Sequence, residues 1–207
     1  MSDYLSDEEQ VERIKRWWSE NGTSLVVSVL VAISGVVGWN WYESRTEERS
    51  SDAFNVYAEY MEQRKLSGVE ENALIRLDEE YEGTAYHVFT LLFRAKDAVD
   101  AGDLEEALDY LQLAVKATKD KTLKDIALLR LSKLQAQLKE YDSALLSLGS
   151  MRGSGYKVAI AELTGDIHYS RGQVELARAA YKAGLEDVSD SDDIGLLRLK
   201  LSSLMAD

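Results

Sequence analysis

The stretch GDLEEALDYLQLA, residues Gly102–Ala114, decides the fold because it recurs twice along the chain. The other copies are KEYDSALLSLGSM, Lys139–Met151, and GQVELARAAYKAG, Gly172–Gly184. Each copy has a turn residue, a large apolar residue two places later, an alanine after three more residues and a second large residue four places beyond it. The copies begin 37 and 33 residues apart, near the tetratricopeptide period of about 34. The sequence therefore predicts a solenoid of helical hairpins, with an irregular helical bundle as the alternative.

Small residues mark the places where the two helices of each predicted hairpin meet. The repeated alanines of the second helices are Ala107, Ala144 and Ala177. The matching small residues of the first helices are Ala95, Ser132 and Gly165. The large residues expected to fill the gap toward the next hairpin are Leu111, Leu148 and Tyr181. A small residue facing a large one lets two helices approach closely without leaving a void.

The boundaries of the units follow from this pattern. The first helices of the three hairpins are expected at Tyr86–Ala101, Leu123–Leu138 and Val158–Arg171. The repeats then cover about 86–118, 123–153 and 158–187, and a capping helix follows over 191–204. Upstream, Glu43–Leu66 and Val69–Glu82 are expected to form an atypical first hairpin, since the terminal units of a solenoid usually differ from the inner ones.

Composition agrees with an all-α fold. The 207 residues include no proline and no cysteine; proline breaks helix interiors but is common in turns, and without cysteine neither disulfides nor thiolate metal sites can form. The net charge is −13. The first 21 residues hold six acidic and three basic side chains, and residues 22–42 hold no charge, so ten of the thirteen excess negative charges lie after residue 42. That charge disfavours nucleic acid and anionic lipid as partners.

A second feature is the apolar run LVVSVLVAISGVVGWNWY, Leu25–Tyr42. With Gly22 as its start the segment has 21 residues, enough to cross a hydrocarbon core as a helix, which takes about 20. A cleaved signal peptide is the alternative, but its apolar part is shorter and ends in small residues, whereas this run ends in Trp39, Trp41 and Tyr42. We therefore expect an uncleaved single-pass anchor with interfacial aromatic residues.

The anchor divides the chain into three parts: a short amphipathic segment at 1–21, the transmembrane anchor at 22–42 and the repeat domain at 43–207. The first segment has a capping box that starts at Ser6 and could lie on the bilayer surface; a frayed tail is the alternative. We expect Asn21 and Gly22 to turn it into the anchor, and the anchor helix to run on past Glu43 as one long rod. Three basic residues before the anchor against two after it weakly favour a cytoplasmic N-terminus.

Two surfaces are candidates for binding. In a tetratricopeptide-like solenoid the first helix of each hairpin lines the concave groove. The residues expected to line it are Phe89, Leu92, Lys96, Val99, Ile126, Leu129, Lys133, Glu162, Asp166 and Tyr169. Its first two units are apolar with one lysine each, while the third is acidic, which suits an unfolded segment or an amphipathic helix. The alternative is that the C-terminal helix or Glu43–Leu66 covers these residues.

The second surface lies in the anchor, where small residues follow a helical spacing. They are Ser24, Ser28, Ala32, Ser34 and Gly38. Such a stripe allows another transmembrane helix to approach closely, although small residues are also common in membrane helices that have no dedicated partner.

No constellation of residues points to catalysis. Of the two histidines, His87 and His168, each sits in the first helix of a repeat, where a packing or solvent-exposed role is expected. The sequence has no HExxH, glycine-rich phosphate loop or GxSxG motif. Asp190, Asp192 and Asp193 lack the glycine and distal glutamate of a calcium loop and are expected to form a solvated linker. We therefore expect a non-enzyme without metal or cofactor.

The chain resembles the family of ancillary SecYEG translocon subunits over nearly its full length. Besides the repeats, the residues that carry the resemblance are Gln10-Val11-Glu12, Lys15-Arg16-Trp17-Trp18, Glu20-Asn21-Gly22 and, at the end of the anchor, Gly38-Trp39. The joint order of these segments is specific, whereas the repeats alone are not.

The resemblance implies a single-pass protein of the bacterial inner membrane with a cytoplasmic N-terminus and a periplasmic repeat domain. It also implies association with the SecYEG translocon and with the membrane-anchored periplasmic chaperone PpiD. The implied role is to help pass emerging, unfolded secreted polypeptides to periplasmic chaperones. The alternative is a structural scaffold that tethers envelope complexes without binding clients.

Overall fold

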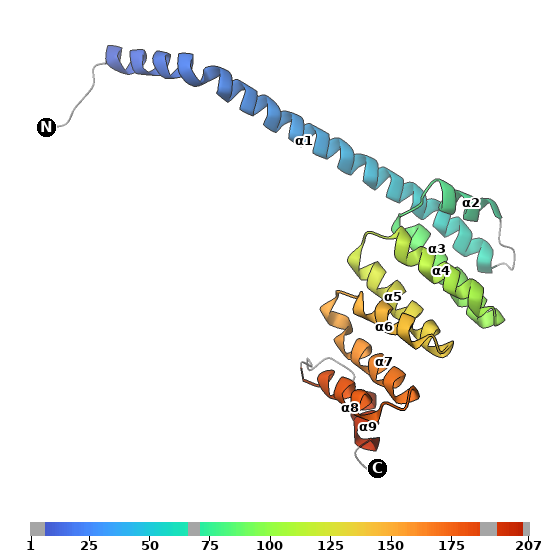
Figure 1. The fold of residues 1–207 in the computed structure, drawn as a ribbon. Helices are drawn as coiled ribbons and strands as arrows, with labels where there is room; N and C mark the ends of the chain where they lie inside the picture. The colour runs from blue at the N-terminus through green and yellow to red at the C-terminus, as the bar shows by residue number, and fades with distance from the viewer. Residues whose placement is uncertain (1–6, 66–70, 187–193, 205–207) are drawn as a thin grey trace. The chain divides into compact units, whose positions relative to one another are not determined.

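The computed structural model describes residues 7–65, 71–186 and 194–204, and within these ranges the chain is helical and contains no strand. The expected all-α fold is therefore confirmed. The chain divides into two units, residues 1–51 and 52–207. Helix α1, Asp7–Lys65, runs through the first unit and ends in the second, and all later helices belong to the second (Figure 1).

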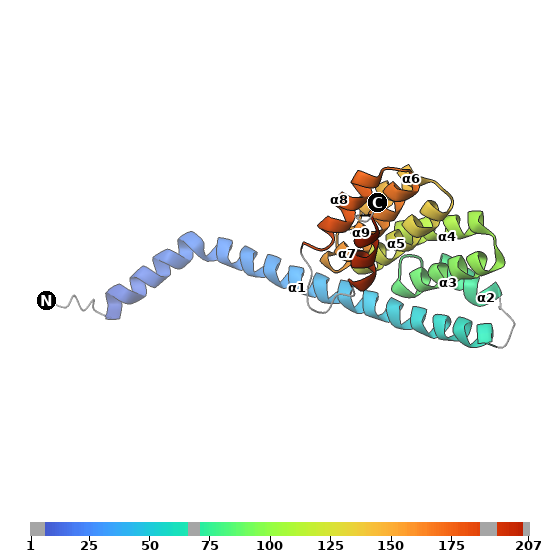
Figure 2. The same cartoon turned by 90° about the horizontal axis from the view of Figure 1, so that it is seen from below.

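The helix α1 is one uninterrupted element of 59 residues. The helix continues past Glu43 without a break, as expected, but the turn expected at Asn21 and Gly22 is absent. Both residues are accommodated within the helix: the Asn21 side-chain amide donates to the Trp17 carbonyl at 3.1 Å, and the Trp18 ring covers Gly22. Figure 2 shows α1 from below, with a bend in its blue part. The expected capping residue Ser6 lies outside the described residues.

The apolar segment of α1 is the one stretch of the described chain that is long and apolar enough to cross a membrane. Only 6% of its most apolar window is buried, whereas the core helix of a soluble domain would be mostly covered. Valine, isoleucine and tryptophan side chains along it are exposed. An uncovered apolar helix of this length fits a bilayer as its surroundings.

Three antiparallel hairpins form the centre of the second unit and stack in chain order (Figure 1). The first pairs α3, Ala85–Ala101, with α4, Leu104–Ala117. The second pairs α5, Lys121–Gln137, with α6, Tyr141–Gly149. The third pairs α7, Lys157–Ser170, with α8, Val174–Ala183. The short 3-10 helix η1, Ser154–Tyr156, precedes α7. Each first helix begins within two residues of its expected start.

The turns of the three hairpins share one backbone conformation. Gly102, Lys139 and Gly172 have φ values of 85°, 64° and 74°, in the left-handed region that glycine adopts most easily. In each turn this residue's N–H donates to a carbonyl three residues back, and the next N–H donates to a carbonyl five residues back. This is the helix-ending motif that leaves few carbonyls unpaired. The alignment of Lys139 with two glycines, made on sequence, is therefore geometrically correct.

The core is built in series, each cluster joining neighbouring helices. The repeated alanines Ala107, Ala144 and Ala177 are fully buried, and the large residues after them are nearly so. One cluster unites α3, α4 and α5, the next unites α5, α6 and α7, and a third joins α8 to α9, Gly195–Ser203. Such nearest-neighbour packing is typical of repeat proteins. The expected ends at 187 and 191–193 lie outside the described residues.

The end of α1 and the helix α2, Glu71–Glu79, form the entry to the repeats. Val56 and Tyr60 of α1 pack with Ala73 and Leu77 of α2, and Tyr86 of α3 lies against them. An ion pair between Arg64 and Asp97 joins α1 to α3. The last turns of α1 therefore belong to the packed domain.

Candidate interaction groove

The residues expected to line a groove lie on α3, α5 and α7, the first helices of the three hairpins, but their surroundings differ along the row. Val99 of α3 is 39% exposed, and Lys96 and Lys133 are exposed as well. Leu92 is only 5% exposed and belongs to the core of the first hairpin. Ile126 and Leu129 of α5 are half-buried against neighbouring core clusters. The row is therefore part surface and part core.

A hollow of about 300 Å³ opens between α3 and α5. Four of the expected residues line it: Leu92, Lys96, Val99 and Lys133. The remaining lining residues are Ala95, Leu111, Arg130, Leu134 and Gln137. The hollow is the part of the expected groove in which the structure brings predicted residues together. We call it the α3–α5 hollow.

The first end of the expected groove is covered by α1. The Phe89 ring centroid lies 6.2 Å from that of Tyr57 on α1 and 6.1 Å from that of Tyr86. Phe54 of α1 also contacts Tyr86, with ring centroids 5.4 Å apart. Burial raises the pKa of the Tyr57 hydroxyl, with the neighbouring Tyr60 acting in the same direction. The alternative that the segment Glu43–Leu66 covers residues of the expected groove is therefore correct for Phe89.

The acidic end of the row is covered by α9. Lys200 Nζ donates to Glu162 Oε1 at 2.6 Å and to Asp166 Oδ2 at 2.7 Å. Burial alone would lower the pKa of Lys200, but the hydrogen bonds from the ammonium group to the two carboxylates raise it overall. The Tyr181 hydroxyl also donates to Asp166, at 2.7 Å. These two groove residues are therefore internally paired, whereas Tyr169 remains exposed.

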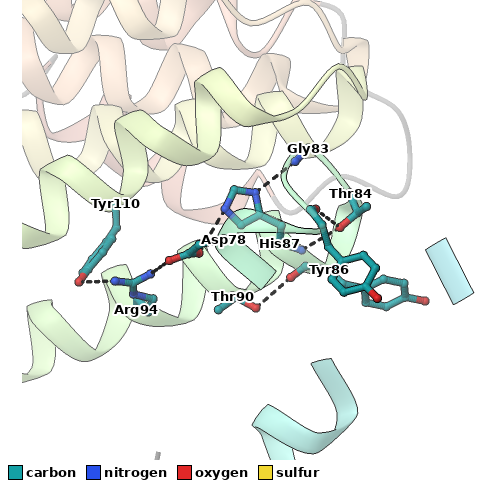
Figure 3. Close-up of polar contacts among 9 residues, drawn as sticks. Asp78, Gly83, Thr84, Tyr86, His87, Thr90, Arg94 and Tyr110 are labelled. Carbon is teal, nitrogen blue, oxygen red and sulfur yellow. Dashed lines mark hydrogen bonds and ion pairs between the residues drawn. The ribbon is translucent and has the colours of Figure 1, made fainter. Parts of the chain in front are cut away.

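A polar network fixes α2 against the first hairpin (Figure 3). Arg94 Nη1 donates to Asp78 Oδ2 at 2.8 Å, and Nη2 donates to the Tyr110 hydroxyl at 3.0 Å. On the other side, His87 Nε2 lies 3.4 Å from Asp78 Oδ1. The Gly83 N–H donates to His87 Nδ1 at 3.3 Å, so the proton of the neutral ring sits on Nε2 and faces the carboxylate.

The electrostatics of this network favour the ionised carboxylate. Burial by itself raises the pKa of Asp78, but the contact with His87 Nε2 at 3.4 Å and the charge of Arg94 lower it overall. Burial opposes the charge of Arg94, and its contacts with Tyr110 and Asp78 raise the pKa of the guanidinium group. The network spans α2, α3 and α4. It acts as a structural clasp.

Both histidines have local partners. His87 is buried within the network, and His168 Nδ1 lies 2.7 Å from Gln173 Oε1 across the third turn. In the described part of the chain no group of three or more His, Cys, Asp or Glu side chains is placed to hold a metal ion. The carboxylates Asp190, Asp192 and Asp193 lie outside the described residues.

The small residues of the apolar segment all lie exposed on α1. The Ser28 hydroxyl donates to the Ser24 carbonyl at 2.8 Å, so it is satisfied within the helix. A methyl group added at Gly38 would meet nothing within 4 Å. Ser24, Ser28 and Ala32 share one face by their spacing of four residues, and their role as a contact for another helix stays a prediction.

Three residues that decide which parts of the groove stay open were not predicted from the sequence. Arg130 and Gln137 line the α3–α5 hollow beside the expected Lys133, and Lys200 closes the acidic end. Arg130 is three residues before Lys133 and so lies on a neighbouring part of the same helix face, a signal that was available. The pairing of Lys200 with residues 34 and 38 positions earlier had no local signal.

The geometry defines a class of protein: a helical-hairpin repeat domain preceded by an apolar helix. A family model described as "Tetratricopeptide repeat-like domain" matches residues 15–206. The chain is 30% identical over 210 residues to a protein of Escherichia coli (strain K12) named "Ancillary SecYEG translocon subunit", covering 99% of both chains. A protein of the same name in Aggregatibacter actinomycetemcomitans is 31% identical over 204 residues, covering 97% of this chain and 98% of its own.

A third relative, from Haemophilus influenzae (strain ATCC 51907 / DSM 11121 / KW20 / Rd), has the same name and is 29% identical over 206 residues, with 97% of this chain and 98% of its own covered. No solved structure matches the chain. The chain belongs to the family of ancillary SecYEG translocon subunits. Its exposed apolar segment and these relatives fit a membrane-anchored protein.

Proposed function

We propose that the protein is a non-enzymatic accessory subunit of a SecYEG translocon in the bacterial inner membrane. The observation that carries this is the extent of the similarity to the named relatives, which covers 97–99% of this chain. It includes the apolar segment as well as the hairpins. Similarity confined to the hairpins would point only to a repeat domain, because one fold serves many unrelated binding roles.

The proposed topology places the N-terminus in the cytoplasm and the hairpins in the periplasm. The basic residues Arg13, Lys15 and Arg16 precede the apolar segment, and only Arg45 and Arg49 closely follow it, which supports this orientation through the positive-inside rule. Alkaline phosphatase, which folds only outside the cytoplasm, fused after residue 207 should be active. An inactive fusion made at normal levels would contradict the topology.

The proposed role of the hairpin domain is to receive emerging secreted polypeptides and pass them to periplasmic chaperones, with PpiD as the membrane-anchored partner. The α3–α5 hollow supports this role because it offers buried apolar side chains within reach of solvent. Apolar side chains are what an unfolded chain exposes and a folded one hides.

One observation favours the alternative, a scaffold that tethers envelope complexes without binding clients. Phe89 is packed against α1, while Glu162 and Asp166 are paired with Lys200. The open part of the groove is therefore short, which suits a small contact with one folded partner as well as a passing segment.

Site-specific photocrosslinking distinguishes the two roles. A crosslinking amino acid at Val99, on the rim of the hollow, should capture an arrested secreted polypeptide in cells. The matched control is Leu146, which is 75% exposed on α6 and does not line the hollow. Capture from Val99 of folded envelope proteins alone would support the scaffold. A crosslinker at Ser28 in α1 that never captures a SecYEG subunit would count against the accessory role itself.

A further inference from the structure

We propose that the α3–α5 hollow selects segments of unfolded polypeptide in which a large apolar side chain is flanked by carboxylates. This inference rests on the proposed function for the source of the segment, an emerging polypeptide. It adds the chemistry that the site recognises, which neither the family nor the hairpin fold assigns.

The floor of the hollow is apolar. Leu92 and Ala95 of α3, Leu111 of α4 and Leu134 of α5 form it, and each is almost fully buried. Because these side chains already belong to the core, the floor is held in place before anything binds. A preformed site saves its ligand the cost of ordering it. The volume of about 300 Å³ is at the small end of binding pockets, which suits one bulky apolar side chain.

The rim of the hollow is cationic. Lys96, Arg130 and Lys133 are all exposed at its edge. Neither Arg130 nor Lys133 has an ion-pair partner among the residues that the structure describes. Lys96 pairs with Asp100 one turn along its own helix, where both side chains are well exposed. Such a surface pair contributes little and exchanges readily with another carboxylate.

This cluster of cations stands in an acidic chain with a net charge of −13. An acidic segment is therefore repelled over most of the surface and attracted at the hollow, so the charge fixes where it binds. A basic segment experiences the opposite. A purely apolar segment would remove water from the three cations without offering them hydrogen-bond acceptors, and this loss of solvation is unfavourable. Carboxylates on both sides of the apolar residue remove that penalty.

The neighbouring contacts limit the length of the segment. Beyond Leu92, Phe89 lies under Tyr57 of α1, and at the far end of the row Lys200 occupies the carboxylates of α7. The positive charge of Lys200 offsets one of these two negative charges and so weakens their repulsion of the same ligand. The recognised unit is thus a few residues long.

Binding of fluorescent peptides to the full-length chain in mild detergent tests the inference. Three peptides share a central Leu-Phe pair and differ only in their flanks, which are Glu, Gln or Lys. The Glu-flanked peptide should bind most tightly and the Lys-flanked peptide most weakly, and rising salt should reduce the difference through screening. The double variant Arg130→Glu, Lys133→Glu should weaken the Glu-flanked peptide about tenfold, since two attractions become repulsions.

The matched control is Lys116→Glu, Lys124→Glu, which changes the net charge equally at two exposed residues of α4 and α5 that do not line the hollow. It should change affinity less than twofold. A second variant, Arg130→Gln, Lys133→Gln, covers the case in which the reversed charges disturb folding, and should weaken binding about threefold. Equal binding of the three peptides, or equal losses in the hollow and control variants, would overturn the inference.

The same variants separate this inference from the proposed function. Capture of a SecYEG subunit from Ser28 should persist in Arg130→Glu, Lys133→Glu, because neither change lies in α1. If that capture persists while peptide selectivity is absent, the selectivity is wrong and the translocon role stands. If a crosslinker at Val99 captures only a second copy of this chain, the hollow is a contact between copies and the inference fails.

Discussion

Adding one methyl group at Gly165 is the sharpest test of how the third hairpin is packed. An alanine Cβ at this position would lie 2.1 Å from Tyr181 Cε1 and 2.4 Å from Cδ1, far inside any normal contact. The ring cannot simply swing away, because Tyr181 is nearly fully buried and its hydroxyl donates to Asp166 at 2.7 Å. Burial, together with the hydrogen bond to Asp166, raises the pKa of that hydroxyl, so the hydroxyl stays a neutral donor.

The expected cost of Gly165→Ala follows from three contributions. Overpacking a core costs about 1–3 kcal/mol, and losing a hydrogen bond to a charged group costs about 1.5–3 kcal/mol. The higher helix propensity of alanine offsets about 1 kcal/mol. The free energy of unfolding should therefore fall by about 1.5–5 kcal/mol. Chemical denaturation followed by far-UV circular dichroism measures this; all four tryptophans lie before residue 52, so their fluorescence does not report on α7 and α8.

A second substitution shows whether Tyr181 is the cause. Combining Gly165→Ala with Tyr181→Leu recreates the Ala95 and Leu111 pair of the first hairpin. The double variant should be at least about 1 kcal/mol more stable than the sum of the single losses predicts. Gly149→Ala is the control, since its new methyl group meets nothing within 4 Å. A neutral Gly165→Ala, or strictly additive losses, would refute the small-against-large account of the repeat.

Three further predictions concern the first two hairpins and the clasp. Lys139→Gly should raise the free energy of unfolding by about 1 kcal/mol, because Lys139 holds a φ of 64°, and Gly102→Ala should lower it by a similar amount. A loss of stability in Lys139→Gly, or a gain in Gly102→Ala, would contradict the shared turn. Ala107→Trp should destabilise by about 3 kcal/mol or more, since Ala107 is fully buried; an unchanged midpoint would count against the alignment. Asp78→Asn should cost about 0.5–1 kcal/mol at pH 7, as its side chain is 39% exposed. Because folding lowers the pKa of Asp78 from 3.8, its contribution is present above that pH and is lost as the pH falls through the depressed value, so wild type and variant should converge in acid.

The helices and the alignment of the hairpins could be predicted because their signals are local. The spacing from the turn to Ala107 and Leu111 repeats at Ala144 and Leu148, and a helix turns this spacing directly into one buried face. The alignment even placed Lys139 at a left-handed turn that glycine occupies in the other two copies. The apolar run near the N-terminus was equally legible, since length and composition alone decide whether a helix can span a bilayer.

The prediction of a turn at Asn21 and Gly22 is wrong. Both residues favour turns by propensity, but here their neighbours decide. Trp18 covers Gly22 and the Asn21 amide bonds to the preceding turn of the same helix, so α1 continues. Propensity is a weak guide wherever the surrounding helix satisfies the residue.

The sequence by itself determined which helices form, how they pair into hairpins and which small residues lie between them, because these follow from contacts close along the chain. Only the tertiary structure decided which parts of the groove stay open. Tyr57 covers Phe89, and Lys200 pairs with Glu162 and Asp166, across separations of 32 to 38 residues. Such contacts depend on how successive hairpins stack and where the flanking helices pack, and a periodic pattern does not encode either.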